Sequence, residues 1–175
     1  MLSHLLSGMT FLKQWIDKIL SLFLITIVGT MTVLVTYQVA SRYLFNSPSA
    51  VSEVLSRYLF IWLILFGSAY VFGLREHMAI NFIKDKFNKK LRLLTEMFIE
   101  LVTVTFAYTI MIIGGYNSAV RQMWQLDSAL QIPMGVIYSA IPIAGGLIFF
   151  YFIYNELSLI HQLRTLNRQS SQSEV

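Results

Sequence analysis

Residues 41–81, SRYLFNSPSAVSEVLSRYLFIWLILFGSAYVFGLREHMAIN, are the most informative part of this chain for its fold. This stretch leaves one apolar segment, passes through Asn46-Ser47-Pro48 and enters a second apolar segment behind Glu53 and Arg57. Proline fixes its own φ and disfavours helix in the residue before it, so the tripeptide is typical of a turn. The stretch therefore predicts two apolar helices joined by a short loop.

The whole chain has the composition of an integral membrane protein. Of its 175 residues 56% are hydrophobic and only 13% are charged, and the mean hydropathy is +0.63. About a quarter of the residues of a soluble domain are charged, and a water-soluble protein of this size could not bury so much apolar surface. The chain has no cysteine, which excludes disulfides, thiol catalysis and cysteine metal sites. Its basic residues form no stripe interleaved with aromatic residues, so nucleic-acid binding is not expected.

Four runs with few or no charges predict an all-α membrane protein with spans at about residues 19–41, 54–74, 97–120 and 133–155. A spanning helix needs about 20 apolar residues. A cleaved signal peptide is the alternative for the first run, but its apolar core would be only about 7–15 residues, followed by a small-residue cleavage site. This run is longer and lacks that site, so we expect it to be retained. Pro133 fits the first turn of the last helix, and Pro142 is expected to kink it.

The segment between the second and third spans, residues 81–94, has an amphipathic pattern. Apolar residues recur at helical spacing, and five basic residues occupy other faces: Lys84, Lys86, Lys89, Lys90 and Arg92. This pattern predicts a short helix along the membrane surface, and a solvated basic connector is the alternative. We divide the rest of the chain into an N-terminal segment (1–18), also expected at the membrane surface, a single four-helix domain (19–160) and a polar tail (161–175).

The basic residues indicate the orientation. Ten of the thirteen lysines and arginines fall in the N-terminal segment, between the second and third spans (Arg75 and the five of the connector) and in the tail, and three fall on the other side: Arg42, Arg57 and Arg121. Short cytoplasmic segments of membrane proteins carry the excess of lysine and arginine. We therefore expect both termini and the connector to be cytoplasmic.

Most membrane chemistry is not expected of this chain. Haem held within the membrane needs axial ligands there, typically histidine, and no histidine lies in the uncharged runs. A proton-coupled exporter needs an ionisable residue at membrane depth; Glu100 comes closest, and we favour a paired or snorkelling acid.

Glu53 and Arg57 have the spacing of a helix ion pair worth about 0.2–0.5 kcal/mol. They form either a local surface pair or a contact with a partner protein. His77 is expected at a helix end rather than on a metal.

The motifs RYLFNSP, SEVLSRYLFIWLILFGSAY, REHMAIN and ALQIPMGVIYSAIPIAGG, in this order over residues 19–155, resemble the small membrane subunit (DctQ/SiaQ type) of tripartite ATP-independent periplasmic (TRAP) transporters. Val51 and Val54 depart from the pattern, where an aromatic residue and a second acid are frequent, and Asn81 stands where aspartate is frequent. The resemblance implies structural or partner-contact roles for the matching residues, which are Arg42, Tyr43, Asn46, Pro48, Glu53, Arg57, Trp62, Gly67, His77, Pro133, Tyr138 and Pro142.

The resemblance also implies a three-component uptake system in a bacterial inner membrane. A periplasmic binding protein captures an organic acid, sialic acid or a C4-dicarboxylate, and a large permease subunit moves it by a sodium-driven elevator motion. The small subunit would be a static scaffold for the large one, with no enzymatic activity and no cofactor, metal or catalytic residue of its own, sodium being held by the large subunit. A self-sufficient small homo-oligomeric transporter or channel is the alternative.

Overall fold

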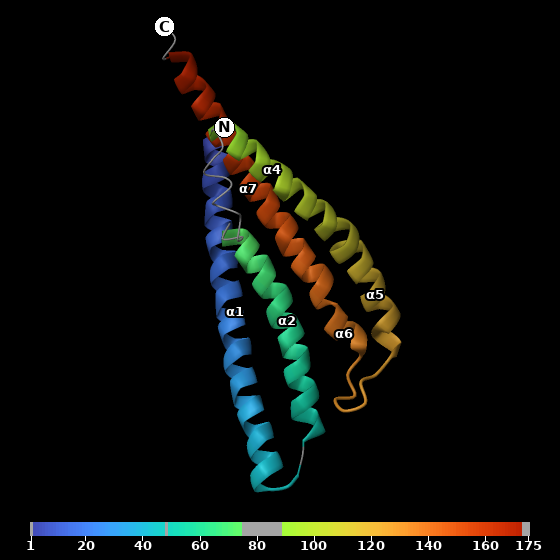
Figure 1. Cartoon of the computed structure of the whole chain (residues 1–175). Coiled ribbons are helices and arrows are strands. Elements are labelled where there is room, and N and C mark those ends of the chain that lie inside the picture. The colour runs from blue at the N-terminus through green and yellow to red at the C-terminus, as the bar shows by residue number, and fades with distance from the viewer. Residues whose placement is uncertain (1, 48, 75–88, 173–175) are drawn as a thin grey trace.

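The computed structural model describes residues 2–47, 49–74 and 89–172, and these are largely helical (Figure 1). In chain order the elements are α1 (Leu2–Leu44), α2 (Ala50–Leu74), α4 (Lys89–Phe106), the π-helix η1 (Ala107–Gly114), α5 (Gly115–Arg121), the 3₁₀-helix η2 (Gln122–Trp124), α6 (Met134–Tyr138) and α7 (Ala140–Gln172). Four segments are long and apolar enough to cross a membrane: Gly8–Leu44, Ala50–Leu74, Leu93–Trp124 and Met134–Ile160. The prediction of four spanning helices is confirmed.

The first helix is longer than expected. α1 is unbroken over 43 residues, about 64 Å at 1.5 Å per residue and twice the roughly 30 Å hydrocarbon core of a bilayer. Residues 1–18 were expected to form a separate segment, but their described part continues the axis of the first span. No proline interrupts the chain here, and Lys13 pairs with Asp17 one turn further on, at 2.7 Å.

The basic connector falls largely outside the described residues, and so do Pro48 and His77. The described part of the connector, from Lys89 onward, forms the beginning of α4, which continues without a break into the third span. The interfacial helix over residues 81–94 therefore stays a prediction.

The fourth span, Met134–Ile160, is interrupted near its N-terminal end, as Pro142 predicts. Proline has no N–H to bond the carbonyl four residues earlier, here that of Tyr138, and α6 ends at this residue. α7 begins again after Ser139. Pro133 differs slightly from expectation, because it stands just before the first helical residue with an extended backbone (ψ 127°).

α7 is the central helix of the molecule. It packs against α2 on one side and against α4 and η1 on the other, while α1 packs mainly on α2 (Figure 1). The core between these helices contains Phe66 and Phe72 of α2 and Ala144 and Tyr151 of α7.

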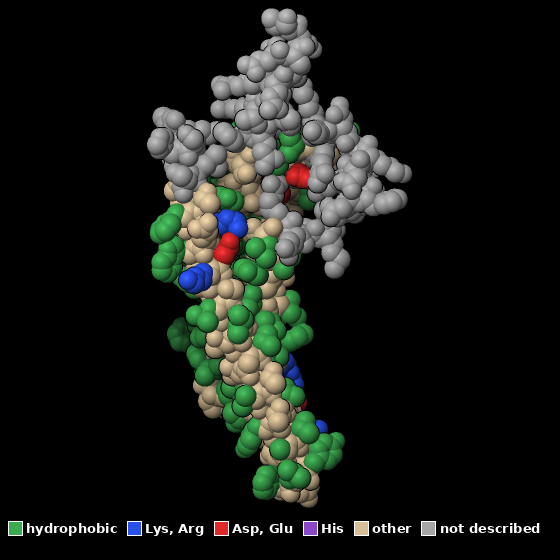
Figure 2. Space-filling view, turned by 90° about the vertical axis from the view of Figure 1, so that its left-hand side faces the viewer, with side chains coloured by type: hydrophobic (Ala, Val, Ile, Leu, Met, Phe, Trp, Pro, Cys, Tyr) green, Lys and Arg blue, Asp and Glu red, His purple; other side chains and the backbone are tan. Residues whose placement is uncertain are grey.

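Much of the apolar surface remains uncovered. Side chains such as Ile25 and Val33 of α1 are each 68% exposed, and Figure 2 shows hydrophobic side chains along most of the described length of this face. A surface of this kind is stable only in contact with hydrocarbon or with another apolar protein surface.

Candidate functional site

The described residues contain no group of three or more histidine, cysteine, aspartate or glutamate side chains that could hold a metal ion. The polar side chains instead form small clusters that tie helices together, one towards each end of the membrane domain. We describe the cluster nearer the termini first.

A polar cluster joins α1 to α7. Asp17 lies between two partners: Lys13 Nζ is 2.7 Å from its Oδ2 atom, and the Tyr151 hydroxyl donates a hydrogen bond of 2.6 Å to its Oδ1 atom. The Lys13 ammonium also lies 5.7 Å from the ring centroid of Tyr151 and 5.6 Å from that of Tyr154, within cation–π range. The side chains of Lys13 and Asp17 are only 15% and 18% exposed, and Tyr151 is fully buried. Both carboxylate oxygens therefore have partners in a largely dry setting.

Gly73 of α2 makes room for this cluster. A Cβ atom at this position would lie 2.5 Å from Cε1 of the Tyr151 ring, closer than real Cβ contacts come. The sequence pattern singled out Gly67 instead, and a Cβ atom there would meet nothing within 4 Å. Gly73 thus serves packing inside this chain, whereas Gly67 lies where another molecule or lipid could approach closely.

The expected turn between the first two spans is present. Asn46 adopts a left-handed conformation (φ 47°), which asparagine tolerates better than most residues. The Ser41 hydroxyl donates a hydrogen bond to the carbonyl of Ser47, whose N–H bonds the carbonyl of Ser41 at 3.1 Å. Ser49 then caps α2, because its hydroxyl oxygen accepts the Ser52 N–H at 3.4 Å and its carbonyl accepts the Glu53 N–H at 3.4 Å.

Glu53 and Arg57 form the local ion pair that their spacing predicts. Arg57 Nη2 lies 3.3 Å from Glu53 Oε1, and the two side chains are 64% and 48% exposed, respectively. An exposed pair of this kind contributes about 0.2–1 kcal/mol. The pair is therefore a weak structural element whose outer surface is open to other molecules.

The other residues carried by the resemblance do not converge on one site. Arg42 and Tyr43 are exposed at the end of α1. Trp62 packs between α1 and α2, with its ring centroid 6.3 Å from that of Phe23 and 5.6 Å from that of Phe66. Tyr138 lies beside the interruption of the fourth span, half-buried. The described residues of this group support helix packing and loop geometry rather than a shared binding site.

Asp127, which the sequence did not indicate, organises the loop between the third and fourth spans. Its Oδ1 atom accepts hydrogen bonds from the backbone N–H groups of Ala129 and Leu130, both at 2.8 Å. Its Oδ2 atom accepts a hydrogen bond from the Tyr58 hydroxyl of α2. The bond from Tyr58, helped by that from Leu130, holds the pKa of the Asp127 carboxyl below its usual value of 3.8, so the group is ionised at neutral pH. The sequence signal for this role was an aspartate followed by small residues in a loop, a combination in which the side chain often bonds the backbone of a turn.

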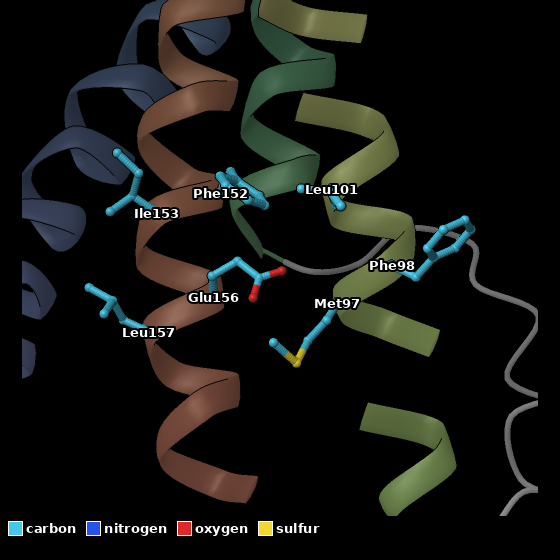
Figure 3. A pocket seen from close by; sticks show the side chains of 7 residues that line it. All are labelled: Met97, Phe98, Leu101, Phe152, Ile153, Glu156 and Leu157. Carbon is cyan, nitrogen blue, oxygen red and sulfur yellow. The ribbon is translucent and has the colours of Figure 1, made fainter. Parts of the chain in front are cut away.

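An apolar groove lies between α4 and α7 (Figure 3). It has a volume of about 430 Å³ and is lined mainly by apolar side chains, including Met97, Leu101 and Phe152. Figure 3 shows Glu156 pointing from α7 towards α4. Glu100 of α4 is buried, with 6% exposure, so it is covered by protein rather than snorkelling to the membrane surface. The lining suits hydrocarbon or an apolar helix and offers no catalytic arrangement.

Comparison with known proteins adds a consistent set of similarities. Residues 31–162 match the family model described as "Tripartite ATP-independent periplasmic transporters, DctQ component". The chain is 29% identical over 149 residues to a putative TRAP transporter small permease protein of Haemophilus influenzae, covering 85% of this chain and 92% of that protein. It is 26% identical over 155 residues to the sialic acid TRAP transporter small permease protein SiaQ of Vibrio cholerae, covering 89% and 87%.

A third relative is much longer. The sialic acid TRAP transporter permease protein SiaT of Haemophilus influenzae is 27% identical over 138 residues, which is 78% of this chain but only 21% of that protein. A segment similar to this chain therefore occurs inside a larger permease protein.

Proposed function

Because the chain belongs to the DctQ family of TRAP transporter components, we propose that it is the small permease subunit of a sodium-driven TRAP transporter for an organic acid. The observation that carries the proposal is the family match over residues 31–162 on a chain with four membrane-spanning helices. The names of the SiaQ and SiaT relatives favour sialic acid over a C4-dicarboxylate as the substrate.

The proposed partners are a large permease subunit in the same bacterial inner membrane and a periplasmic substrate-binding protein. The similarity to part of the longer SiaT permease supports a close association with a large permease. The uncovered apolar faces of this chain provide surface for such a partner within the bilayer.

The subunit is proposed to act as a static scaffold. A moving transport domain needs polar groups at membrane depth to bind the substrate or ions. The polar clusters in the described part of this chain instead bond to one another and tie helices together, as Asp17 does with Tyr151. Close glycine contacts reinforce these ties, since a Cβ atom at Gly145 would lie 2.8 Å from Cβ of Met111 on the neighbouring span.

Co-expression tests the proposed function. We expect this chain to co-purify with a large TRAP permease subunit of the same organism, and sialic acid uptake into proteoliposomes to require both subunits, the binding protein and an inward sodium gradient. Uptake by the large subunit alone is the control. A lone oligomer of this chain that transports an organic acid by itself would replace the proposal with a self-sufficient transporter.

The same assay examines the scaffold role. A Gly115→Cys, Ile141→Cys pair places two cysteines side by side on the third and fourth spans, because a Cβ atom at 115 would lie 3.1 Å from Cβ of Ile141. A disulfide needs about 3.5–4.5 Å between the Cβ atoms, so its formation requires a small outward shift of the two helices, and the reduced double variant is the reference. In a static scaffold, oxidation should leave uptake within about twofold of the reduced sample, well below the tenfold of a 1.4 kcal/mol barrier change. Loss of uptake that reduction restores, with assembly unchanged, would show that these spans move.

The proposed orientation has both termini in the cytoplasm. The ten-to-three bias of basic residues supports it. The start of α1 and the end of α7 lie towards the same end of the molecule (Figure 1), which supports placing the two on one side of the membrane. Reporter fusions after Asn46 and Leu126 are expected to read periplasmic, and a fusion after Lys89 cytoplasmic. The reverse pattern would invert the topology.

A further inference from the structure

The loop between the third and fourth spans is tightly built for a surface loop. The Asp127 N–H donates to the Ile132 carbonyl at 2.9 Å, the Gln131 N–H to the Asp127 carbonyl at 3.0 Å, and the Met134 N–H to the Gln125 carbonyl at 2.8 Å. Gln131 adopts φ 55° to close the turn. Residues 125–134, here called the far loop, therefore have a defined backbone rather than a loose connection.

The far loop forms one unit with the helices that flank it. α6 packs on α5 and η2, and at Gly135 the two backbones approach so closely that a Cβ atom would lie 2.3 Å from the Ala119 carbonyl oxygen. A displacement of the loop would therefore carry the start of the fourth span with it.

α2 reaches this unit through one polar side chain. The Tyr58 hydroxyl donates to Asp127 Oδ2, 69 residues away in sequence, and lies 3.4 Å from the Met134 sulfur. Both Asp127 oxygens are engaged at once, one by Tyr58 and one by the loop's own N–H groups. The aspartate thus couples the internal shape of the loop to its attachment on the first helical hairpin.

We propose that Asp127 is a positioning residue, which through Tyr58 fixes the far loop and the start of the fourth span on the end of α2. The inference rests on the proposed function for its consequence: the loop lies on the side assigned to the periplasm, next to Trp124, which is 93% exposed. Held in this way, the loop presents a preformed surface at the place where substrate arrives, and no ordering cost falls on each encounter with the periplasmic component.

Two variants distinguish the bond between Tyr58 and Asp127 from the hydrogen bonds that Asp127 makes within the far loop. Tyr58→Phe removes the hydroxyl and leaves the bonds from Ala129 and Leu130 to Asp127 in place, whereas Asp127→Ala removes both. Tyr116→Phe is the matched control, because Tyr116 is 62% exposed on α5. The chain has no cysteine, so spin labels can be attached specifically to Val51→Cys and Ser128→Cys, both at exposed positions. Pulsed electron paramagnetic resonance then measures the distance between α2 and the far loop.

In the assembled complex, the unmodified chain should give one narrow distance distribution. In Tyr58→Phe and in Asp127→Ala, the ratio of molecules with a longer label-to-label distance to molecules with the original distance should rise about fivefold. This ratio corresponds to the ~1 kcal/mol of one hydrogen bond. Because the two side chains act as one contact, the double variant should be no worse than Asp127→Ala, and Tyr116→Phe should change nothing. Unchanged distances, or additive effects of the two variants, would overturn the attachment.

Uptake decides whether the position matters for transport. With assembly equal by size-exclusion chromatography, both variants should raise the apparent KM for the loaded binding protein by about the same fivefold and leave the maximal rate unchanged. Altered distances with an unchanged KM would refute the positioning role. If the unmodified complex transports nothing, the proposed function fails, while the distance measurement still tests the attachment by itself.

Discussion

Gly135→Ala is expected to destabilise the membrane domain more than any other single methyl group added at the described glycines. The new Cβ atom would lie 2.3 Å from the backbone oxygen of Ala119 and 2.8 Å from Cγ and Sδ of Met123. Met123 could turn away, but a carbonyl oxygen within a helix cannot move unless α5 and α6 separate. Overpacking typically costs 1–3 kcal/mol, and a backbone clash places this variant at about 3 kcal/mol or more.

The measurement is the midpoint of thermal unfolding in detergent, followed by fluorescence size-exclusion chromatography. Gly146→Ala is the control, because a Cβ atom there meets nothing within 4 Å and alanine is favoured over glycine in a helix by about 1 kcal/mol. That variant should be as stable as the original chain or more so. Equal midpoints for the Gly135 and Gly146 variants would show that α5 and α6 do not approach as described.

Asp17→Ala is expected to have the second largest effect. It leaves the Lys13 ammonium and the buried Tyr151 hydroxyl without their shared partner. Removing one member of a buried ion pair costs about 3–5 kcal/mol. Because Lys13 and Asp17 retain 15% and 18% exposure, some water can replace the lost contact, and we expect about 2–3 kcal/mol of lost stability.

Two comparisons make this prediction specific. Glu53→Ala breaks the exposed pair with Arg57 and should cost less than about 1 kcal/mol. The double variant Lys13→Met, Asp17→Leu removes both charges and should recover part of the stability, because apolar replacement of a buried pair is often neutral, while the Tyr151 hydroxyl stays without its acceptor. The interpretation would not survive if Asp17→Ala were as mild as Glu53→Ala, or if the double variant were worse than the single one.

The number of spans and the irregularities of single helices can be read from the amino-acid sequence. Long uncharged runs identify spanning helices because a charged side chain is costly in hydrocarbon, and the four expected spans are present. The turn at Asn46 and the interruption before Pro142 follow from backbone conformations that these residue types favour or cannot adopt. The ordered motifs likewise indicated the DctQ family over most of the chain.

Which helix faces meet could not be predicted from the sequence and follows from the packing of the helices. An apolar helix in lipid lacks the one-sided polar pattern that marks the buried face of a soluble helix, so nothing local distinguished the tightly packed Gly73 and Gly135 from the open Gly67. The continuation of the N-terminal segment into α1 also depends on contacts with another helix, since Lys13 and Asp17 are held by Tyr151.

The two hydrogen bonds that join distant parts of the chain, Tyr58 to Asp127 and Tyr151 to Asp17, could not be predicted from the sequence for the same reason. Tyr58 and Asp127 are 69 residues apart, and Asp17 and Tyr151 are 134 apart. Periodicity along a chain reports on the face of one helix, whereas a hydrogen bond between helices depends on their relative rotation and depth. Those two quantities are set by the packing of whole helices, and they brought together acids and tyrosines that each looked, in the sequence, like an ordinary residue at a membrane interface.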